Sequence, residues 1–472
     1  MKYTAINIGP ILQTFSMVRK PKELWAASYM FSYLMKCIID ELAKSGYNII
    51  SPAKLSSEAD KTIGLYPDRV FVEGEVKQYL LDNAFKSFAK ELCLDEKKIR
   101  PYFNIMSVTK DTEEKGVIMY LNRLLDRMEL CNLKSNDSVE KAREAVFEYL
   151  RGNLVSMQEV TGKKFKNHSI ETIASYDIFE GDDKKNDKTD KYICIVQADG
   201  DNMGEVVSAC PEPLVATLSE KLLKFGQACC QSIRNYGGLP IYAGGDDLLF
   251  LAPVLTSKGS IFDLIESLDE HYKKVQQYVV DKKLQTDSQT SMSYGISMTY
   301  HKYPLYEALA KARDSLFVTA KKNVKGKNAV AWTLQKHSGS SFSAALSKNM
   351  MGLYAALKKV IEATENEQLV SAVSHKIRHN EVLLSLWLNV SDENMIKQRI
   401  QNFFDNIVDI EGKSDAAIKY MEAVQGLLFE VYKNADSLSK ETDKLKKMKE
   451  LTAIVYGMLR TAKFVKGKEE DK

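Results

Sequence analysis

Residues 191–335 alternate short apolar segments with amphipathic ones in an order that few folds accommodate. "KYICIVQADGD" predicts a strand that ends in acidic residues, and Gly237 and Gly238 end the helix that follows it. "LPIYA", "GGDD" and "LLFLAPV" predict a hairpin. The pattern then predicts a helix, a strand, a helix and a last strand at 261–283, 291–300, 303–322 and 328–334. Strand, helix, hairpin, helix, strand is the order of a ferredoxin-like split βαβ unit.

The hairpin turn "GGDD" places Asp246 next to Asp247, although adjacent carboxylates repel each other. In the predicted topology the first strand lies beside the hairpin, so Asp199 at its end is close to Asp246. Carboxylates from adjacent strands can hold Mg²⁺ or Mn²⁺, with the Gly200 carbonyl oxygen as a further ligand. Two such ions could activate an attacking oxygen and stabilise a leaving one. The alternative interpretation of "GGDD" alone is an ordinary surface turn.

Two stretches near these carboxylates predict contacts with a nucleotide. "DGDNMG" passes from a strand end to a helix start, where the backbone N–H groups of Asn202, Met203 and Gly204 could bind a triphosphate. Gly244 and Gly245 leave space for a nucleotide to approach the hairpin backbone. Together with the carboxylates, these residues predict a site for metal-bound nucleotides.

Lysines and a serine near other helices are weaker candidates. In "AKKNVKGKN", Lys321 and Lys327 could reach phosphate oxygens as point charges, although lysines at helix ends are commonly only solvated. Ser28 and Arg19 could belong to a second nucleotide site. The sequence leaves the roles of these four residues open.

The rest of the chain predicts three further regions. Residues 1–115 form a degenerate ferredoxin-like domain, with strands at 3–9, 47–51 and 68–74, a helix at 22–44 and mostly helix from about 76. Residues 116–185 form a helical linker, and the charged stretch 180–191 is expected to mark the boundary with the next domain. Residues 186–335 hold the nucleotide site, and 336–472 form a helical C-terminal domain. The predicted class is therefore α+β, with two ferredoxin-like domains.

Charge and cysteine usage exclude several classes. The net charge of +3 does not indicate a general nucleic-acid binder, and no apolar run is long enough to span a membrane. The seven cysteines form no CxxC pair and lie mostly in apolar stretches, so we expect them to be reduced. No signal peptide is recognisable, and we expect a cytoplasmic protein.

Several of these motifs resemble one known family. "IGPILQTFSMVRKPKELWAASYMFSYL" is similar to the start of the first palm domain in the large subunit of type III-B CRISPR-Cas (Cmr) effector complexes, the Cas ten family. "ADGDNMG", "LPIYAGGDDLLFLAP" and "SYGISMTYHKYPLYEALAKARDSLFVTAKK" resemble its second palm domain, in the same order. This resemblance covers roughly 330 residues.

The resemblance implies a reaction. ATP bound with a divalent metal would be joined into a cyclic oligoadenylate, a second messenger made when the complex binds target RNA. Asp199 and Asp246 would be the main metal ligands, Asp247 would assist the metal or the attacking hydroxyl, and Asp201 would assist the metal more weakly. The first palm would supply part of a second nucleotide pocket between the palms. Other Cmr subunits, crRNA and target RNA would be the partners.

Two departures and two alternatives accompany the resemblance. The chain starts at the first palm and contains no His-Asp dipeptide, so we expect neither the HD nuclease domain nor DNase activity. Only Cys93 and Cys131 lie between the palms, so we expect no zinc site. The same site could instead join AMP to S-adenosylmethionine or make a cyclic dinucleotide. The chain could also be a non-catalytic scaffold, with its C-terminal helices docking other subunits.

Overall fold

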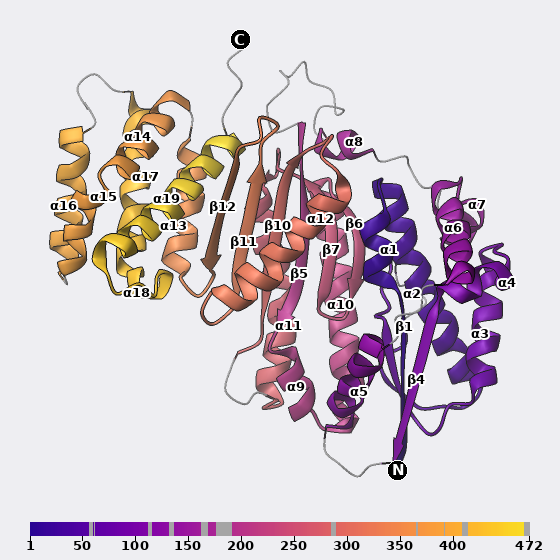
Figure 1. Ribbon diagram of the computed structural model, residues 1–472. Coiled ribbons are helices and arrows are strands. Elements are labelled where there is room, and N and C mark those ends of the chain that lie inside the picture. The colour runs from indigo at the N-terminus through magenta and orange to yellow at the C-terminus, as the bar shows by residue number, and fades with distance from the viewer. Residues whose placement is uncertain are drawn as a thin grey trace.

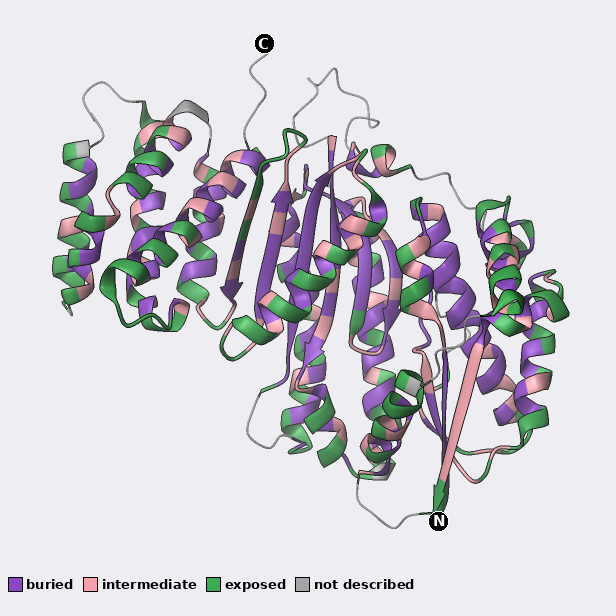
Figure 2. Cartoon of the chain, in the orientation of Figure 1, coloured by how far each residue is buried: buried purple, intermediate pink, exposed green. Residues whose placement is uncertain are grey.

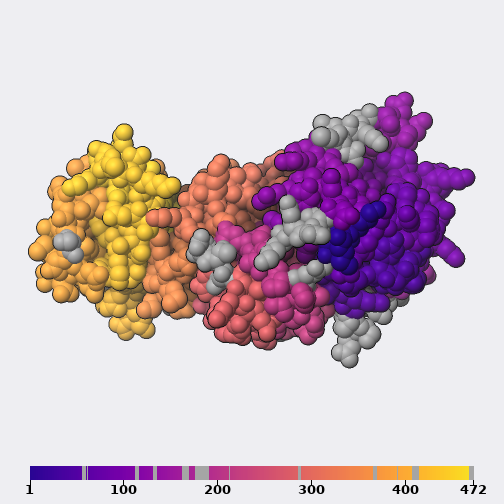
Figure 3. Space-filling model, turned by 90° about the horizontal axis from the view of Figure 1, so that it is seen from below, coloured from indigo at the N-terminus to yellow at the C-terminus, as the bar shows by residue number. Residues whose placement is uncertain are grey.

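The computed structural model shows three parts arranged in a row, with the sheet of the second palm domain in the middle (Figures 1 and 3). No helix in the described part of the chain is long and apolar enough to cross a membrane. The structure describes residues 1–55, 60, 62–111, 116–131, 136–161, 169–175, 191–284, 289–364, 367–390, 392–407 and 414–466.

The middle part is a six-stranded sheet in the order β12-β11-β10-β5-β7-β6. Its strands are β5 (Tyr192–Asp201), β6 (Leu239–Gly244), β7 (Asp247–Pro253), β10 (Ser291–Tyr300), β11 (Ala329–Gln335) and β12 (Ser341–Ser347). Its helical segments are α9 (Met203–Ala209), α10 (Glu212–Tyr236), α11 (Ile261–Asp281), α12 (Leu305–Asp314) and the π-helical η4 (Ser315–Asn323). A small ribbon of β8 (Leu255–Thr256) and β9 (Gly259–Ser260) precedes α11. Strands β10-β5-β7-β6 are antiparallel neighbours in the ferredoxin-like order.

Both faces of this sheet are covered, which explains why its strands are apolar throughout. Along β5, Tyr192, Cys194 and Val196 belong to the core that α10 and α11 complete. Ile193 and Ile195 face the opposite way, into the core that α12 shares with the first palm. Buried residues therefore run along the full length of the central strands (Figure 2).

The first part repeats the same strand order in a smaller sheet, β2-β3-β1-β4. Its elements are β1 (Lys2–Gly9), α1 (Ile11–Met17), α2 (Pro21–Lys44), β2 (Ile49–Ser51), β3 (Arg69–Glu73), α3 (Gln78–Glu91), α4 (Glu96–Ile99), η1 (Arg100–Tyr102) and β4 (Asn104–Asp111). The predicted α+β class with two ferredoxin-like sheets is thus confirmed. β1 ends in Asn7, Ile8 and Gly9, without the acidic residues that end β5.

The described residues from 76 to 180 are mostly helical, as predicted, but the sequence missed β4, which pairs with β1 along all eight of its residues. The helices that follow are α5 (Val117–Cys131), α6 (Asp137–Arg151), α7 (Val155–Thr161) and α8 (Ile170–Ala174). The charged stretch expected to mark a domain boundary lies, apart from Lys191, outside the described residues.

The C-terminal part begins with a strand, so the prediction that residues 336–472 are entirely helical is wrong for 341–347. β12 pairs antiparallel with β11, and Phe342, Ala344 and Leu346 alternate with small polar or half-buried residues. The helices are α13 (Met351–Ala363), α14 (Glu367–His379), α15 (Glu381–Ser385), η5 (Leu386–Asn389), α16 (Glu393–Ile407), α17 (Asp415–Lys433), α18 (Ala435–Leu438) and α19 (Lys444–Lys466). A Cβ built on Gly457 of α19 would lie 2.6 Å from the Ser343 carbonyl oxygen, so this helix packs directly on the edge strand.

The first palm covers the outer edge of β6, which is the last strand of the six-stranded sheet. The Ala243 N–H donates to the Gly64 carbonyl oxygen at 3.0 Å, and the Ser28 hydroxyl donates to the Ile241 carbonyl oxygen at 2.9 Å. Trp25 Nε1 donates to the Thr62 carbonyl oxygen at 2.8 Å, which anchors the bridging segment to α2. Because an uncovered edge strand leaves backbone groups unpaired, these bonds stabilise the position of one palm against the other.

Candidate functional site

The hairpin between β6 and β7 turns through two residues, Gly245 and Asp246. Gly245 has a φ of +69°, a left-handed conformation that glycine adopts without steric cost. A Cβ on Gly244 would lie 2.2 Å from the Tyr242 hydroxyl oxygen, so any other residue at this position would have to displace the Tyr242 ring. The glycines therefore permit a tight turn that presents Asp246 at the end of the sheet where β5 also ends.

β5 brings a second carboxylate to the same place. The last paired residues of β5 and β7 are Ala198 and Leu248, so Asp199 directly follows the paired segment. A Cβ built on Gly200 would lie 2.4 Å from Asp246 Oδ2. The absence of a side chain at Gly200 thus lets Asp246 lie against the backbone of β5, and the structure brings together three of the four residues predicted to hold a metal, Asp199, Gly200 and Asp246.

The carboxyl groups at this end of the sheet repel one another. The pKa of Asp246 is raised to about 6 by burial and by the charge of Asp199. Burial also raises the pKa of Asp199, although Lys321 opposes that shift. Asp247 is exposed. The protein packed around its carboxyl group and the charges of Asp199 and Asp246 nevertheless raise the pKa of Asp247 above its usual range. A cation placed among these groups would relieve the repulsion.

The ammonium group of Lys321 already contacts part of this cluster. Lys321 Nζ donates to Asp199 Oδ2 and, at 2.8 Å, to the Gly200 carbonyl oxygen, and it lies 3.7 Å from Asp201 Oδ1. The sequence predicted Lys321 as a phosphate ligand, whereas here it lies among the carboxylates. The contacts of Lys321 show that oxygen atoms of Asp199 and Gly200 converge on one positive charge.

Asp201 is held differently from the other acidic residues. It is fully buried, and its Oδ2 accepts hydrogen bonds from Ser291 Oγ at 2.7 Å, Ser293 Oγ at 2.7 Å and the Asn328 N–H at 2.9 Å. Its Oδ1 accepts a second bond from Ser293 at 3.0 Å. These bonds tie the end of β5 to β10 and to the loop before β11, so Asp201 is better suited to fix the site than to bind a metal.

A cavity of about 720 Å³ lies beside the carboxylates and is lined by positive charge. Lys327 Nζ donates to Asn202 Oδ1 at 2.8 Å, which places both predicted residues on its wall. The lysines that line the cavity are Lys321, Lys322, Lys325, Lys327 and Lys440, and its described lining includes no carboxylate. Sequence reasoning missed Lys322 and Lys325, which lie in the same basic run, and Lys440, which lies in the loop between α18 and α19.

The other two predicted phosphate ligands lie in the first turn of α9. Met203 is buried, and a Cβ built on Gly204 would lie 3.3 Å from Met119 Cε. Helix α5 therefore packs against α9 on the side of Gly204. The structure brings Asn202 to the lysine-lined cavity, but neither Met203 nor Gly204 is among the residues that line it.

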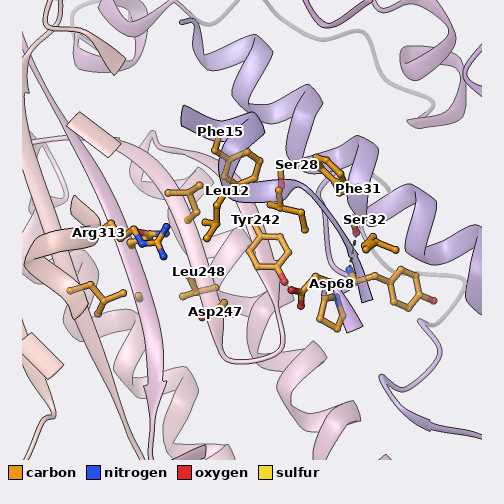
Figure 4. Close-up of a pocket in the computed structure, with 18 of the residues that line it drawn as sticks. Leu12, Phe15, Ser28, Phe31, Ser32, Asp68, Tyr242, Asp247, Leu248 and Arg313 are labelled. Atoms are coloured by element: carbon orange, nitrogen blue, oxygen red, sulfur yellow. Dashed lines mark hydrogen bonds between the residues drawn. The ribbon is translucent and has the colours of Figure 1, made fainter. Parts of the chain in front are cut away.

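A second cavity, of about 240 Å³, lies between the two palms (Figure 4). Ser28 and Phe15 enter it from the first palm, and Asp247 and Leu248 from β7. Its wall is mostly apolar, with Asp68 and Arg313 as further charged groups; the full lining adds Ile8, Ile11, Leu12, Phe31, Ser32, Tyr66, Pro67, Gln197, Ala198, Tyr242, Leu249, Leu316 and Phe317. Arg19, which the sequence grouped with Ser28, lines a different cavity.

Asp199, Asp246 and the Gly200 carbonyl, at the end of the sheet, fit a hard divalent cation. The donors are two carboxylates and one carbonyl oxygen, which suit Mg²⁺ or Mn²⁺ when a substrate phosphate completes the coordination. Within the described residues no group of three or more His, Cys, Asp or Glu side chains is arranged to hold a metal ion. Any ion here would therefore depend on Asp199, Asp246, the Gly200 carbonyl and oxygen atoms from its ligand.

Two family models match the chain. Residues 192–331 match the Cas10/Cmr2 second palm domain, and residues 3–91 match the N-terminal domain of the CRISPR-associated protein Cmr2. A curated relative, the CRISPR system Cmr subunit Cmr2 of Pyrococcus furiosus, is 26% identical over 330 residues. That match covers 60% of this chain and 35% of the relative, so the chain matches about a third of that protein's length.

Solved structures share the fold. A chain from the cryo-EM structure of the type III-B Cmr-beta complex bound to cognate target RNA matches with a TM-score of 0.54 and 10% identity, covering 89% of this chain and 80% of that chain. A chain from the crystal structure of the Csm1–Csm4 cassette in complex with cA3 matches with a TM-score of 0.52 and 12% identity, covering 90% of this chain and 69% of that chain. At these identities the likeness establishes a common architecture.

Proposed function

Because this chain belongs to the Cas10/Cmr2 family of CRISPR-associated proteins, we propose that its second palm domain is a metal-dependent nucleotidyl transferase that converts ATP into a cyclic oligoadenylate. The observation that carries the proposal is the convergence of Asp199, Asp246 and the Gly200 carbonyl beside a lysine-lined cavity. An acidic centre next to a basic cavity is the arrangement that a metal-bound triphosphate requires.

The proposed step is an in-line displacement at phosphorus. The 3′-hydroxyl oxygen of one nucleotide forms a bond to the α-phosphorus of another, the bond from that phosphorus to the bridging oxygen breaks, and pyrophosphate leaves. Mg²⁺ or Mn²⁺ held by Asp199, Asp246 and the Gly200 carbonyl would supply positive charge to the reacting phosphate. Asp247 is suited to take the hydroxyl proton, because its raised pKa makes the carboxylate a better base than a solvated aspartate.

The two cavities provide places for the two ends of the nucleotides. The triphosphate would lie in the lysine-lined cavity, where Lys321 and Lys327 contact phosphate oxygens and Lys321 exchanges its carboxylate contacts for phosphate ones. The mostly apolar cavity between the palms would hold a base next to Asp247. A nucleotide placed there would make the reaction depend on how the palms are joined. Catalysis would thus rest on position and charge.

We further propose that the chain acts within a type III-B complex, with other Cmr subunits, crRNA and target RNA as partners. The match to a Cmr subunit and the shared architecture with a chain from a Cmr-beta complex support this assignment. The described C-terminal helices expose several large apolar side chains, including Val382, Leu386 and Met395, which suit subunit docking.

Mass spectrometry of the products tests the proposed reaction. The chain, alone and in its reconstituted RNA-bound complex, is incubated with ATP and Mg²⁺ or Mn²⁺, with and without S-adenosylmethionine. We expect masses equal to three or more AMP units, each minus one water, dependent on target RNA; two such units are the mass of a cyclic dinucleotide. An adduct of AMP with S-adenosylmethionine, or a cyclic dinucleotide, would keep the site and change the product. No pyrophosphate release under any condition would leave the scaffold role.

Lys440 tests whether the C-terminal helices contribute to triphosphate binding. Lys440→Ala is expected to raise KM for ATP about threefold to tenfold with little change in kcat, because one exposed charge–phosphate contact contributes roughly 1 kcal/mol. Lys446→Ala removes another exposed lysine, on α19 and outside the cavity lining, and is the matched control. Steady-state kinetics of pyrophosphate release measure both. An unchanged KM in the Lys440 variant would place the triphosphate elsewhere.

A further inference from the structure

A third cavity, of about 940 Å³, opens at the end of the second palm sheet opposite the carboxylates. Five cationic side chains line it: Arg19, Lys20, Lys22, Arg151 and Lys302. They come from the entry to α2, the end of α6 and the turn after β10. Two carboxylates, Glu23 and Glu171, complete the charged lining, so positive charge is in excess.

This basic cavity is distant from the proposed reaction. β10 pairs with β5 over ten residues, from Asp201 opposite Ser291 to Tyr192 opposite Tyr300. At about 3.3 Å per residue, the turn after Tyr300 lies roughly 30 Å from the carboxylate cluster. The two ends are marked in Figure 1 by α8 at the top and α9 at the bottom. A ligand in the basic cavity therefore occupies a site separate from the nucleotide site.

Most of the positive charge in the basic cavity is not used by the fold. Arg19, Lys20, Arg151 and Lys302 are exposed, and none forms a salt bridge with another described residue. Lys22 differs, because its Nζ donates to the Gly152 carbonyl oxygen at 2.7 Å and links α2 to the end of α6. Arg151 lies over the Phe147 ring, with its guanidinium carbon 5.6 Å from the ring centroid, but this contact uses no N–H donor. The four exposed cations are therefore available to an anion.

Two other residues of the lining, Glu23 and His301, also favour an anionic ligand in the basic cavity. Glu23 is buried, and its Oε2 already accepts the Arg19 backbone N–H at 2.9 Å. Both ring nitrogens of His301 are shielded from water and have no hydrogen-bond partner among the described residues. An imidazole without partners is unfavourable unless a bound group supplies one. His301 can donate one hydrogen bond to an oxygen of such a group.

We propose that the basic cavity binds the phosphodiester backbone of single-stranded RNA. Four exposed cations from three separate segments suit a row of phosphates better than one compact anion. The lining contains no Phe, Tyr or Trp side chain on which the base of a free nucleotide could stack. The contacts would therefore be made to phosphates and would be independent of sequence. This inference does not rest on the proposed nucleotidyl transfer.

Charge reversal of three of these residues tests the proposal. The full chain carrying Lys20→Glu, Arg151→Glu and Lys302→Glu is titrated with fluorescein-labelled oligouridylate, and fluorescence anisotropy is measured over a range of KCl concentrations. We expect the affinity at low salt to fall about tenfold or more. The plot of log K against log salt should become less steep by about 2, because each contact with a single-stranded phosphate contributes about 0.7.

A matched variant controls for net charge. Lys86→Glu, Lys90→Glu and Lys97→Glu reverse three exposed lysines on α3 and α4, away from the basic cavity, and should leave the RNA affinity near the wild-type value. Equal losses in both variants, or an unchanged affinity and slope in the cavity variant, would overturn the proposal. The alternative ligand of the basic cavity is a free nucleotide. Calorimetry of ATP binding to both variants, with divalent metal chelated, tests that alternative. Loss of ATP binding with RNA binding intact would also overturn it.

Discussion

Asp246→Asn is expected to reduce pyrophosphate release from ATP by at least about a thousandfold while leaving the fold no less stable than the wild type. Asparagine keeps the shape of the side chain but removes the charge that would hold a metal against Asp199. The ionised carboxylate is unfavourable in the metal-free protein, since burial and Asp199 raise its pKa to about 6. A neutral asparagine avoids this unfavourable buried charge. The variant should therefore lose activity without losing stability.

The ionisation of Asp246 should make the stability of the metal-free protein depend on pH. The pKa of Asp246 is about 6 in the folded chain against an ordinary value of 3.8, so ionisation is disfavoured by folding. The metal-free wild type should therefore lose stability as the pH rises through this interval, and Asp246→Asn should lose less. Thermal unfolding in EDTA measures both proteins. Added Mg²⁺ should then raise the wild-type Tm more than that of the variant.

Asp263→Asn is the control for Asp246→Asn, because Asp263 has the opposite environment. Its Oδ2 accepts hydrogen bonds from the Ser260 N–H at 2.8 Å and hydroxyl at 2.7 Å, and Lys358 lies 2.9 Å from its Oδ1. These contacts stabilise the start of α11, so the control should lower the free energy of unfolding by about 1 kcal/mol and keep activity. If Asp246→Asn keeps activity within tenfold of the wild type, Asp246 is not a metal ligand.

The carboxylate site could be predicted because its signals are local and its topology is simple. Gly245 requires a turn, β5 is apolar up to its acidic end, and the ferredoxin-like order places that end beside the hairpin. Asp199 and Asp246 are 47 positions apart, but only one strand pairing relates them. The family models match residues 3–91 of the first palm and residues 192–331 of the second, which include these motifs.

The residues that were missed depend on packing between distant segments. β4 and β12 are edge strands with many polar or half-buried residues, so their period-two pattern is weak beside that of β5. Lys440 lines the lysine-lined cavity from the loop between α18 and α19, far along the chain from the other lysines of that cavity. Lys321 lies in the π-helical η4, a form that the sequence pattern does not signal, and from there its ammonium group contacts Asp199.

Gly295→Ala should disturb the fold and the site together, because Gly295 is the contact point between β10 and the helical segment that carries Lys321. A Cβ built there would lie 2.2 Å from the Ala312 carbonyl oxygen and 2.3 Å from the Leu316 backbone nitrogen. Both atoms belong to the backbone at the junction of α12 and η4, so no side-chain rotation relieves the overlap. The junction has to move away from the sheet, and the ammonium group of Lys321 moves with it.

We therefore expect Gly295→Ala to lower the free energy of unfolding by about 3 kcal/mol and to reduce ATP turnover at least about tenfold in the fraction that stays folded. Urea denaturation and pyrophosphate release measure the two effects. Gly426→Ala is the matched control, because Gly426 lies on an exposed face of α17 and a Cβ there would have no atom within 4 Å. Alanine at that position should stabilise the chain by up to about 1 kcal/mol, since it favours helix over the unfolded state. If Gly295→Ala instead unfolds at the wild-type urea concentration and keeps full turnover, the close packing of η4 on β10 does not set the position of Lys321, and the lysine does not act from that segment as proposed.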